Sequence, residues 1–399
     1  MTNKPLFAGE GARRVRLGEL ISKAKTERCG DRSFPVLSMT MHDGIIAQSE
    51  RFKKAIASKD VSSYKVVYPG QLVVGFPIDE GVIYVQGFDK SGIMSPAYNV
   101  WDIDASIVFP GYLELALHGP SCMAYYADKM RGTTARRRTL TSANLTAMSI
   151  PLPDFSQQKR IVDIFGTVRA QMNVCRRQFS LFDNLVKSRF VEMFGDPSDN
   201  SRNYQVVSIG EILSVQPSNG LYKPQKDYVT DGSGVPIIRI DSFNEEGPNY
   251  SALKRLNCTQ KETEKYGLRD GDIVVNRVNS IGCMGKTMLI DHLPEVVVFE
   301  SNMMRMHVEE STMFPRFLRH QMTSDYAKHY FESHAKKAIG QASINQADVK
   351  GLKVLVPPYV DQKSFLDFAA EVDKSRVVVQ KQIERLQTLY DSLAQEYFG

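Results

Sequence analysis

The sequence predicts a mixed α/β protein, in which two similar domains are joined by a long antiparallel two-helix coiled coil and related by a pseudo-two-fold axis. Three observations support this fold class. Segments of the first half of the 399 residues recur, in the same order, in the second half. Each copy ends in a long apolar stripe of helical period. The region before each stripe contains short runs of β-branched residues between glycine and aspartate turns.

The repeat is clearest near the end of each copy. Gln158 recurs as Gln362 and Leu185 as Leu389, each pair 204 residues apart. Earlier in each copy the offset drifts by several residues, as loop insertions would cause. The drifting matches are Gly18-Glu19-Leu20 with Gly210-Glu211-Ile212, Gly70-Gln71-Leu72-Val73 with Gly271-Asp272-Ile273-Val274, and Phe109-Pro110 with Phe314-Pro315. A period this long far exceeds that of a solenoid repeat, so we interpret the chain as a duplicated domain.

Each apolar stripe advances by alternating steps of four and three residues. The first stripe consists of Ile161, Phe165, Val168, Met172, Cys175, Phe179, Phe182 and Val186. The positions 204 residues later are also apolar, except for Arg376, for which Asp163 or Glu192 of the other helix is a candidate partner. A sustained 3.5-residue period is typical of a coiled-coil seam. The alternative is that each stripe packs on its own domain, but their equal length and register favour packing on each other.

The repeat and the stripes divide the chain into four parts. They are a first domain over residues 1–150, a helix over 151–196, a second domain over 197–355 and a helix over 356–399. A turn-rich linker over residues 196–200 ends the first helix. The second helix must run back to pair along the first, so the pair is antiparallel. About 40 residues at a rise of 1.5 Å give a spacer of roughly 55–60 Å.

Both domains are expected to mix strands and helices. The predicted strands are Tyr64–Tyr68, Leu72–Phe76 and Val82–Gly87 in the first copy, and Ile237–Ile240, Ile273–Val278 and Val296–Phe299 in the second. Helices are expected after Pro110 and Pro315.

Charge and composition restrict the function classes only weakly. With 50 Lys+Arg against 45 Asp+Glu, the net charge is +5 and the pI about 8.7, which permits a nucleic-acid partner without requiring one. Five scattered cysteines, without a C-x-x-C pair, indicate neither a disulfide framework nor a zinc site. No apolar run approaches the roughly 18 residues of a membrane helix, and the N-terminal residues lack the apolar core of a signal peptide. We therefore expect a cytoplasmic protein.

Several fragments resemble parts of enzymes, but none is complete. Ser280–Thr287 ends like a phosphate-binding loop, yet Ser280 stands where that loop needs its first glycine. Val356-Pro357-Pro358-Tyr359 resembles the [N/D]PPY loop of amino-methyltransferases, but valine cannot accept a hydrogen bond from the target amine. The seven histidines occur singly, without metal-ligand spacing. The sequence thus predicts no catalytic residue and no metal ligand. It favours binding over the alternative of a nucleotide-dependent enzyme that uses Gly282–Thr287.

Two diverged domains on a spacer are suited to reading DNA. Two-fold readers place their recognition units about 34–36 Å apart, or multiples of that distance, which a spacer of this length can span. Divergent domains would read different half-sites of an asymmetric, bipartite sequence. The candidate DNA contacts are Lys53, Lys54, Arg131, Arg136, Arg137 and Arg138 in the first copy, and Tyr222, Lys223, Lys226, Arg239, Arg277, Asn279, Lys336, Lys337 and Gln341 in the second. Arg239, Arg277 and Asn279 are the candidates for base edges, because Arg and Asn pair bidentately with guanine and adenine. Each of these residues has a plain alternative as a solvated surface residue.

Two stretches of the chain resemble a known family. Ile150-Pro151-Leu152-Pro153, followed by the run from Lys187 to Pro197 (KSRFVEMFGDP), resembles the central conserved region of type I restriction–modification specificity subunits. Val356-Pro357-Pro358 and the final Phe398-Gly399 are similar to the distal conserved region of the same family. The recognition domains match only loosely, as expected of regions that vary with the DNA target.

The resemblance implies a non-catalytic subunit that selects the DNA sequence through two target-recognition domains. In this family the subunit assembles with two adenine methyltransferase (M) subunits and two restriction/translocase (R) subunits. Those partners, and not this chain, are expected to carry S-adenosylmethionine, ATP and magnesium. The helices are expected to set the spacer and to dock the partners. Lys187, Arg189 and Glu192 are the candidate docking residues, because they lie off the heptad seam.

Overall fold

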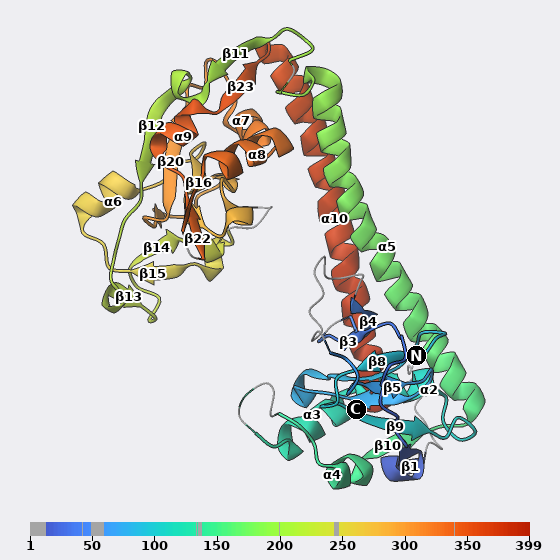
Figure 1. Ribbon diagram of the computed structural model, residues 1–399. Helices are drawn as coiled ribbons and strands as arrows, with labels where there is room; N and C mark the ends of the chain where they lie inside the picture. The colour runs from blue at the N-terminus through green and yellow to red at the C-terminus, as the bar shows by residue number, and fades with distance from the viewer. Residues whose placement is uncertain are drawn as a thin grey trace, which may run out of the picture. The chain divides into compact units, whose positions relative to one another are not determined.

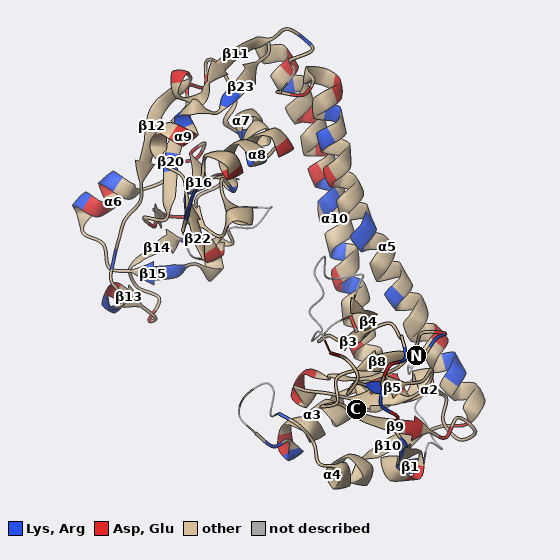
Figure 2. Cartoon of the chain, viewed as in Figure 1, with Lys and Arg blue, Asp and Glu red and all other residues tan. Residues whose placement is uncertain are grey.

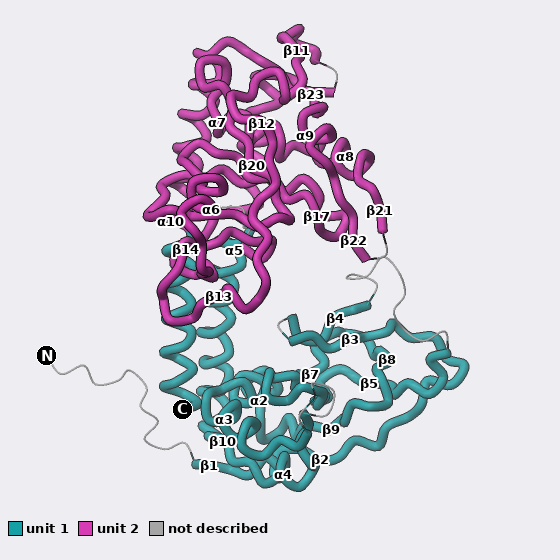
Figure 3. The backbone as a smooth tube through the Cα atoms, turned by 90° about the vertical axis from the view of Figure 1, so that its left-hand side faces the viewer, with its two compact units in different colours: residues 1–177, 380–399 teal, residues 178–379 magenta. Residues whose placement is uncertain are grey.

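The computed structural model describes residues 13–41, 43–48, 60–132, 134, 138–198, 200–242, 247–338 and 340–399. Its contacts divide the chain into two units (Figure 3). The first unit consists of Met1–Arg177 and Gln380–Gly399, and the second of Gln178–Val379. Both units mix helices and strands, which confirms the predicted α/β class. Among the described residues, no helix is both long and apolar enough to cross a membrane.

A four-stranded antiparallel sheet forms the centre of the first unit. Its order is β2 (Ile21–Lys23), β9 (Asn99–Ile103), β6 (Leu72–Val74) and β7 (Ile83–Val85). Helices α2 (Pro110–Leu117) and α3 (Pro120–Lys129) follow it in sequence. Two further strand pairs are β3 (Leu37–Met39) with β4 (Ile45–Ala47), and β5 (Lys65–Val67) with β8 (Gly92–Met94).

The second unit repeats this sheet with the same order of equivalent strands. They are β12 (Leu213–Asn219), β20 (Met303–Val308), β16 (Ile273–Asn276) and β18 (Thr287–Leu289), followed by helices α7 (Pro315–Met322) and α8 (Asp325–His334). This unit also contains a sheet ordered β13 (Tyr228–Val229), β15 (Lys254–Leu256), β14 (Val235–Ile238) and β19 (Val298–Phe299), with helix α6 (Gln260–Tyr266). A three-stranded ribbon is ordered β17 (Val278–Asn279), β22 (Gln341–Ser343) and β21 (Lys336–Ala338).

Each unit is closed by the same small frame beside its long helix. In the first unit the frame is β1 (Arg13–Arg16) paired with β10 (Ser149–Leu152), the 3-10 helix η1 (Leu17–Glu19) and α4 (Ser142–Ala147). In the second unit it is β11 (Gln205–Ser208) paired with β23 (Lys353–Val356), η4 (Ile209–Glu211) and α9 (Gln346–Gly351). The shared frame and sheet order confirm that the chain is a duplicated domain.

The predicted strands and helices are present, with shifted ends. The expected helices after Pro110 and Pro315 are α2 and α7, which begin at these prolines because a proline at the first helical position loses no hydrogen bond. The predicted strand at Ile237–Ile240 ends earlier, at Ile238, because Ile240 begins a 3-10 turn. The predicted strand at Ile273–Val278 is divided between β16 and β17.

The two long helices are α5 (Phe155–Phe194) and α10 (Tyr359–Phe398), each of 40 residues, or about 60 Å. Figure 1 shows both helices, and each belongs partly to one unit and partly to the other (Figure 3). In the second unit Phe194 contacts Phe365, and Asp183 pairs with Arg376. From Asp183 to Phe194 the chain advances eleven residues along α5, while the partner residues go back eleven positions along α10, from Arg376 to Phe365. This opposite direction confirms the antiparallel seam.

The last aromatic residue of each long helix is inserted into a domain core. Phe194 is fully buried in the second unit, where its ring lies 5.1 Å from that of Phe317. Phe398, its repeat 204 residues later, is 2% exposed in the first unit and packs against Tyr112, at 5.6 Å between ring centroids. A side chain at Gly119 would collide with Phe398, so this glycine is required by the close approach of the helix.

Arg376, which interrupts the apolar seam, pairs with Asp183 of α5 and lies 3.6 Å from Asp373 of its own helix. The prediction of an acid on the partner helix is confirmed, but neither Asp163 nor Glu192 is that acid. The 3.5-residue period identifies the residues that face the seam, while the register between helices decides which of them meet. Burial, together with the nearby arginines, lowers the pKa of His320 to about 3, so this ring stays neutral and adds no charge to the cluster.

Replacing Phe398 with alanine is expected to destabilise the first unit by about 3–4 kcal/mol, because it opens a cavity between Tyr112 and Phe165. Phe194→Ala is expected to do the same to the second unit. Hydrogen exchange of each unit in denaturant measures both effects. Val378→Ala, an exposed position of α10, is the control and should change stability by less than about 0.5 kcal/mol. Loss of stability in the same unit for both phenylalanine variants would contradict the assignment.

A double-mutant cycle on Asp183 and Arg376 is expected to give a coupling energy of about 0.5–1 kcal/mol, measured from denaturant unfolding. The value is modest because the two side chains are 43% and 22% exposed. The control cycle uses the i,i+3 pair Glu371 and Lys374, whose side chains are about 70% exposed, and should give less. Equal coupling in the two cycles would show that the seam pair has no special role.

Candidate nucleic-acid interface

Four of the predicted DNA-contact residues come together on the ribbon of β17, β22 and β21. Lys336 pairs with Ser343, Lys337 with Ala342, and Asn279 with Ala342 from the opposite side. Side chains alternate along each strand, so Lys337 and Asn279 share one face, while Lys336 and Gln341 share the other. Figure 3 shows this ribbon in the second unit. It joins residues about 60 positions apart in the sequence, and both lysines are exposed.

Arg277 anchors the ribbon to a neighbouring turn. Its backbone N–H donates to the carbonyl of Asn302 at 2.9 Å, and its Nη1 donates to the carbonyl of Ser301 at 3.1 Å. Its own carbonyl accepts from the backbone N–H of Ile344 at 3.0 Å. The Nε of Arg277 finds no acceptor among the described residues. The guanidinium is therefore held in position, and its unpaired Nε is buried.

A second group of predicted residues gathers around Glu300. Arg239 approaches this carboxylate with its Nε 3.5 Å from Oε2, and its guanidinium lies over the ring of Tyr228 at 5.3 Å. The backbone N–H of Ile240 donates to the other carboxylate oxygen at 2.8 Å. Arg239 is thus partly neutralised, and contact with a base would require it to share or leave Glu300.

Lys223 is paired with acidic side chains, whereas its neighbours Tyr222 and Lys226 are exposed. Lys223 Nζ lies 2.9 Å from Glu262 and 3.9 Å from Asp227, and the hydrogen bond to Glu262 raises the pKa of the lysine. Tyr222 is 77% exposed, and Lys226 is exposed in a 3-10 turn. Tyr222 and Lys226 are therefore better placed for an external partner than Lys223.

The Glu300–Asn302 turn connects these two groups. Leu221, next to Tyr222, donates from its N–H to the carbonyl of Phe299 at 2.8 Å and accepts from the N–H of Ser301 at 2.9 Å. The same turn contacts Arg239 through Glu300 and Arg277 through Ser301. Three segments that carry predicted contact residues thus meet at one turn, through Leu221, Arg239 and Arg277.

Only two of the six candidate residues of the first unit lie within the described residues. Arg131 is exposed, and its backbone pairs with Thr139. Arg138 forms an ion pair with Asp79 and lies 3.5 Å from Glu80, so its guanidinium is engaged inside the unit. Lys53, Lys54, Arg136 and Arg137 lie outside the described residues.

The predicted docking residues lie in the part of α5 that belongs to the second unit. Arg189 pairs with Glu192 at 2.9 Å and lies over the ring of Phe368 at 5.6 Å. Lys187 Nζ is 3.9 Å from Asp325, with both side chains exposed. Figure 2 shows Lys and Arg interspersed with Asp and Glu along both long helices.

Exposed apolar residues of the same helices were not among the predicted site residues. They are Leu181, Leu185 and Val191 on α5 and Val377 and Val378 on α10. All five are more than 40% exposed and belong to the second unit. The repeat offered a signal for them, because Val378 matches the exposed Val174 of the first copy and Leu185 matches Leu389. A partner that covered these side chains would remove apolar surface from water.

The loop that resembled a phosphate-binding motif has a different structure. A 3-10 turn, Ile281–Cys283, is followed by strand β18 rather than by a helix, so the backbone N–H groups of a helix N-terminus are missing. Thr287 donates its hydroxyl to the carbonyl of Gly285 at 2.8 Å and is buried. These features exclude the phosphate-binding arrangement that the enzyme alternative required of Gly282–Thr287.

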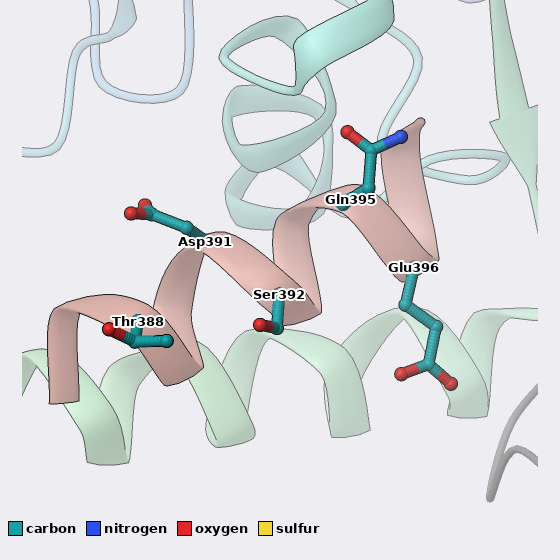
Figure 4. Close-up of a pocket in the computed structure, with 5 residues that line it drawn as sticks. All are labelled: Thr388, Asp391, Ser392, Gln395 and Glu396. Carbon is teal, nitrogen blue, oxygen red and sulfur yellow. The ribbon is translucent and has the colours of Figure 1, made fainter. Parts of the chain in front are cut away.

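The other segments considered as catalytic or metal-binding sites also lack the groups that such sites need. Among the described residues, no group of three or more His, Cys, Asp or Glu side chains could hold a metal ion. Val356-Pro357-Pro358-Tyr359 is the entry to α10. Figure 4 shows a shallow depression lined by Thr388, Asp391, Ser392, Gln395 and Glu396. All five side chains come from α10, and they include no nucleophile paired with a general base.

Comparison with known proteins finds similarity to one family and to several of its members. Residues 201–387 match the family described as "Type I restriction modification DNA specificity domain". The chain is 23% identical over 287 residues to the type I restriction enzyme StySPI specificity subunit of Salmonella potsdam, covering 68% of this chain and 61% of the relative. It is 27% identical over 222 residues to the putative type I restriction enzyme MjaX specificity subunit of Methanocaldococcus jannaschii, covering 55% and 50%. The chain thus spans half to three fifths of the length of these relatives.

Solved structures show the same fold at low sequence identity. One is a chain from a study of the structural basis underlying complex assembly and conformational transition of the type I R-M system, with a TM-score of 0.54, 17% identity and 98% of each chain covered. Another is the type I restriction–modification system S subunit from M. genitalium, with a TM-score of 0.51, 11% identity, and 100% of this chain and 98% of the other covered. At these identities the likeness concerns the fold alone.

Proposed function

We propose that this chain, which is similar to type I restriction–modification specificity subunits, selects the DNA sequence on which such a complex acts. Each unit would act as a target-recognition domain for one half of an asymmetric, bipartite site. The observation that carries the proposal is that two copies of one sheet, with the same strand order, support different additions. One scaffold with two sets of exposed side chains is suited to reading two different half-sites.

The second unit offers both kinds of contact that a DNA reader needs. Lys226, Lys336 and Lys337 are exposed cations suited to phosphates. Arg277, Asn279 and Gln341 are of the residue types that pair with base edges, since Arg pairs with guanine and Asn or Gln with adenine. Tyr222, which is 77% exposed, offers an aromatic face. The ribbon and the Glu300–Asn302 turn would hold these groups at fixed positions relative to one another.

The long helices would set the distance between the half-sites and dock the partner subunits. We infer two adenine methyltransferase subunits and two restriction/translocase subunits, which would supply S-adenosylmethionine, ATP and magnesium, while this chain contributes no catalytic group. The exposed Leu181, Leu185 and Val378 support docking on the second unit's part of the helices, near Lys187, Arg189 and Glu192. The assembled complex would act in the cytoplasm.

Replacing Lys336 and Lys337 with alanine is expected to weaken DNA binding and to reduce the slope of log K against log salt by about 1.8, since each lost phosphate contact removes about 0.9. The measurement is DNA binding by the chain assembled with its methyltransferase partners, over a range of salt concentrations. Lys363→Ala with Lys374→Ala is the matched control. Both control lysines are exposed on α10 but paired with Asp367 and Glu371. An equal change of slope in the control would show that Lys336 and Lys337 are not specific DNA contacts, and the ribbon would not belong to the proposed interface.

Exchange of residues 212–344 for the equivalent segment of a family member with another target is expected to change one half-site only. These bounds leave β11, η4, α9 and β23 in place, so the frame that joins the domain to α10 is kept. Sequencing of methylated DNA from cells with the chimaeric system reports both half-sites. A change in both half-sites would contradict independent reading by the two units.

A further inference from the structure

Two buried glutamines, Gln158 and Gln362, make the same three hydrogen bonds in the two units. Gln158 is 1% exposed. Its Oε1 accepts from the backbone N–H of Phe109 at 2.7 Å, and its Nε2 donates to the carbonyls of Ile107 at 3.3 Å and Pro153 at 3.0 Å. All the hydrogen-bonding capacity of the amide nitrogen is therefore used inside the first unit.

Gln362 repeats this arrangement and is fully buried. Its Oε1 accepts from the backbone N–H of Phe314 at 3.2 Å. Its Nε2 donates to the carbonyls of Thr312 at 3.2 Å and Pro357 at 2.9 Å. The partners are the repeats of Phe109, Ile107 and Pro153, so the duplicated chain retains the whole set of bonds and not only the glutamine.

The bonded backbone atoms belong to the joint between each domain and its long helix. Phe109 is the N-cap residue of α2, and Pro153 lies between β10 and α5. Only Pro153 and Asp154 separate β10 from α5, so rotation at these two residues would swing the helix against the domain. Gln158, in the first turns of α5, ties that joint to the start of α2. Gln362 ties α10 to the start of α7 in the same way.

A neighbouring aromatic pair covers each joint. Phe109 packs against Phe155 at 6.1 Å between ring centroids, and Phe314 packs against Tyr359 at 4.0 Å. Both amides are buried, and a buried polar group without its hydrogen bonds is costly. Any tilt of the helix that lengthens these bonds is therefore resisted.

We propose that Gln158 and Gln362 are positioning residues that fix the direction in which each long helix leaves its domain, and that together they fix the distance between the two DNA half-sites. The second clause rests on the proposed function. A tilt of about 10° at the joint moves a reading surface about 20 Å away by about 3.5 Å, which is close to one base-pair step of 3.4 Å. A loosened joint would thus allow the complex to accept targets whose spacer is one base pair too short or too long.

The test uses Gln158→Met and Gln362→Met, which keep the side-chain length and remove all three hydrogen bonds. Where a methionine variant does not fold, Gln158→Glu or Gln362→Glu is used instead. Glutamate keeps the side-chain volume and the acceptor oxygen but lacks both N–H donors. Affinity is measured for the chain assembled with its methyltransferase partners, on duplexes carrying its own half-sites with spacers of native length and one base pair shorter or longer. The wild type is expected to prefer the native spacer by about tenfold or more, and the variants by much less.

Gln321→Met is the matched control. Gln321 is equally buried and makes two hydrogen bonds of 2.8 Å to the backbone of Leu355, which tie α7 to β23 inside the domain rather than to the long helix. Its loss should lower the melting temperature by a similar amount and leave the spacer preference unchanged. A relaxed preference in Gln321→Met, or an unchanged one in Gln158→Met and Gln362→Met, would overturn the proposal.

A second measurement needs no DNA, so its outcome does not depend on the proposed function. Spin labels are attached through azide-bearing residues at the exposed positions Asp128 and Val174 of the first unit, and at Asp325 and Val378 of the second. The distance distribution in each unit is expected to broaden in its own glutamine variant and to stay narrow in Gln321→Met. If the wild type shows no spacer preference, bipartite reading fails, and these distributions alone decide the role of the glutamines. Distributions as narrow as the wild type in both glutamine variants would refute it.

Discussion

The antiparallel seam between α5 and α10 is the contact on which the rest of the structure depends. Neither helix has a complete apolar environment within its own copy of the repeat, because each stripe needs the other to cover it. The end of each helix also completes a domain core, Phe194 in the second unit and Phe398 in the first. The seam therefore couples the integrity of each domain to a helix from the other copy of the repeat.

A duplicated scaffold can diverge where its side chains face outward and must be conserved where they close the joint. The four-stranded sheet keeps its order in both units, and the buried glutamines keep all three of their partners. The strands beside this sheet, by contrast, are arranged differently in the described parts of the two units, as the pairs β3–β4 and β5–β8 in the first and the sheet β13-β15-β14-β19 in the second. Agreement between the copies at the joint and difference beside the sheet are what the proposed reading of two half-sites requires.

The periodic features could be predicted from the sequence, but the contacts between distant segments of the chain could not. The 3.5-residue stripe predicted both helices and their seam, because facing positions are determined by the period. The partner of Arg376 was not predictable, because Asp183 is selected by the register between two helices about 190 residues apart in sequence. Arg138 and Lys223 looked like free basic residues, yet Asp79 and Glu262, which engage them, are 59 and 39 positions away.

The place of Phe398 in the first unit also bears on how the protein is made. Residues 380–399 leave the ribosome after the whole of the second unit, although they belong to the first. Domains usually fold in the order in which they are synthesised. Here the second unit has all its residues first, while the nascent first unit must wait with Tyr112 and Phe165 uncovered. Synthesis rather than stability thus sets the period in which the chain is most exposed to aggregation, and chaperones would find their binding site in the earlier domain.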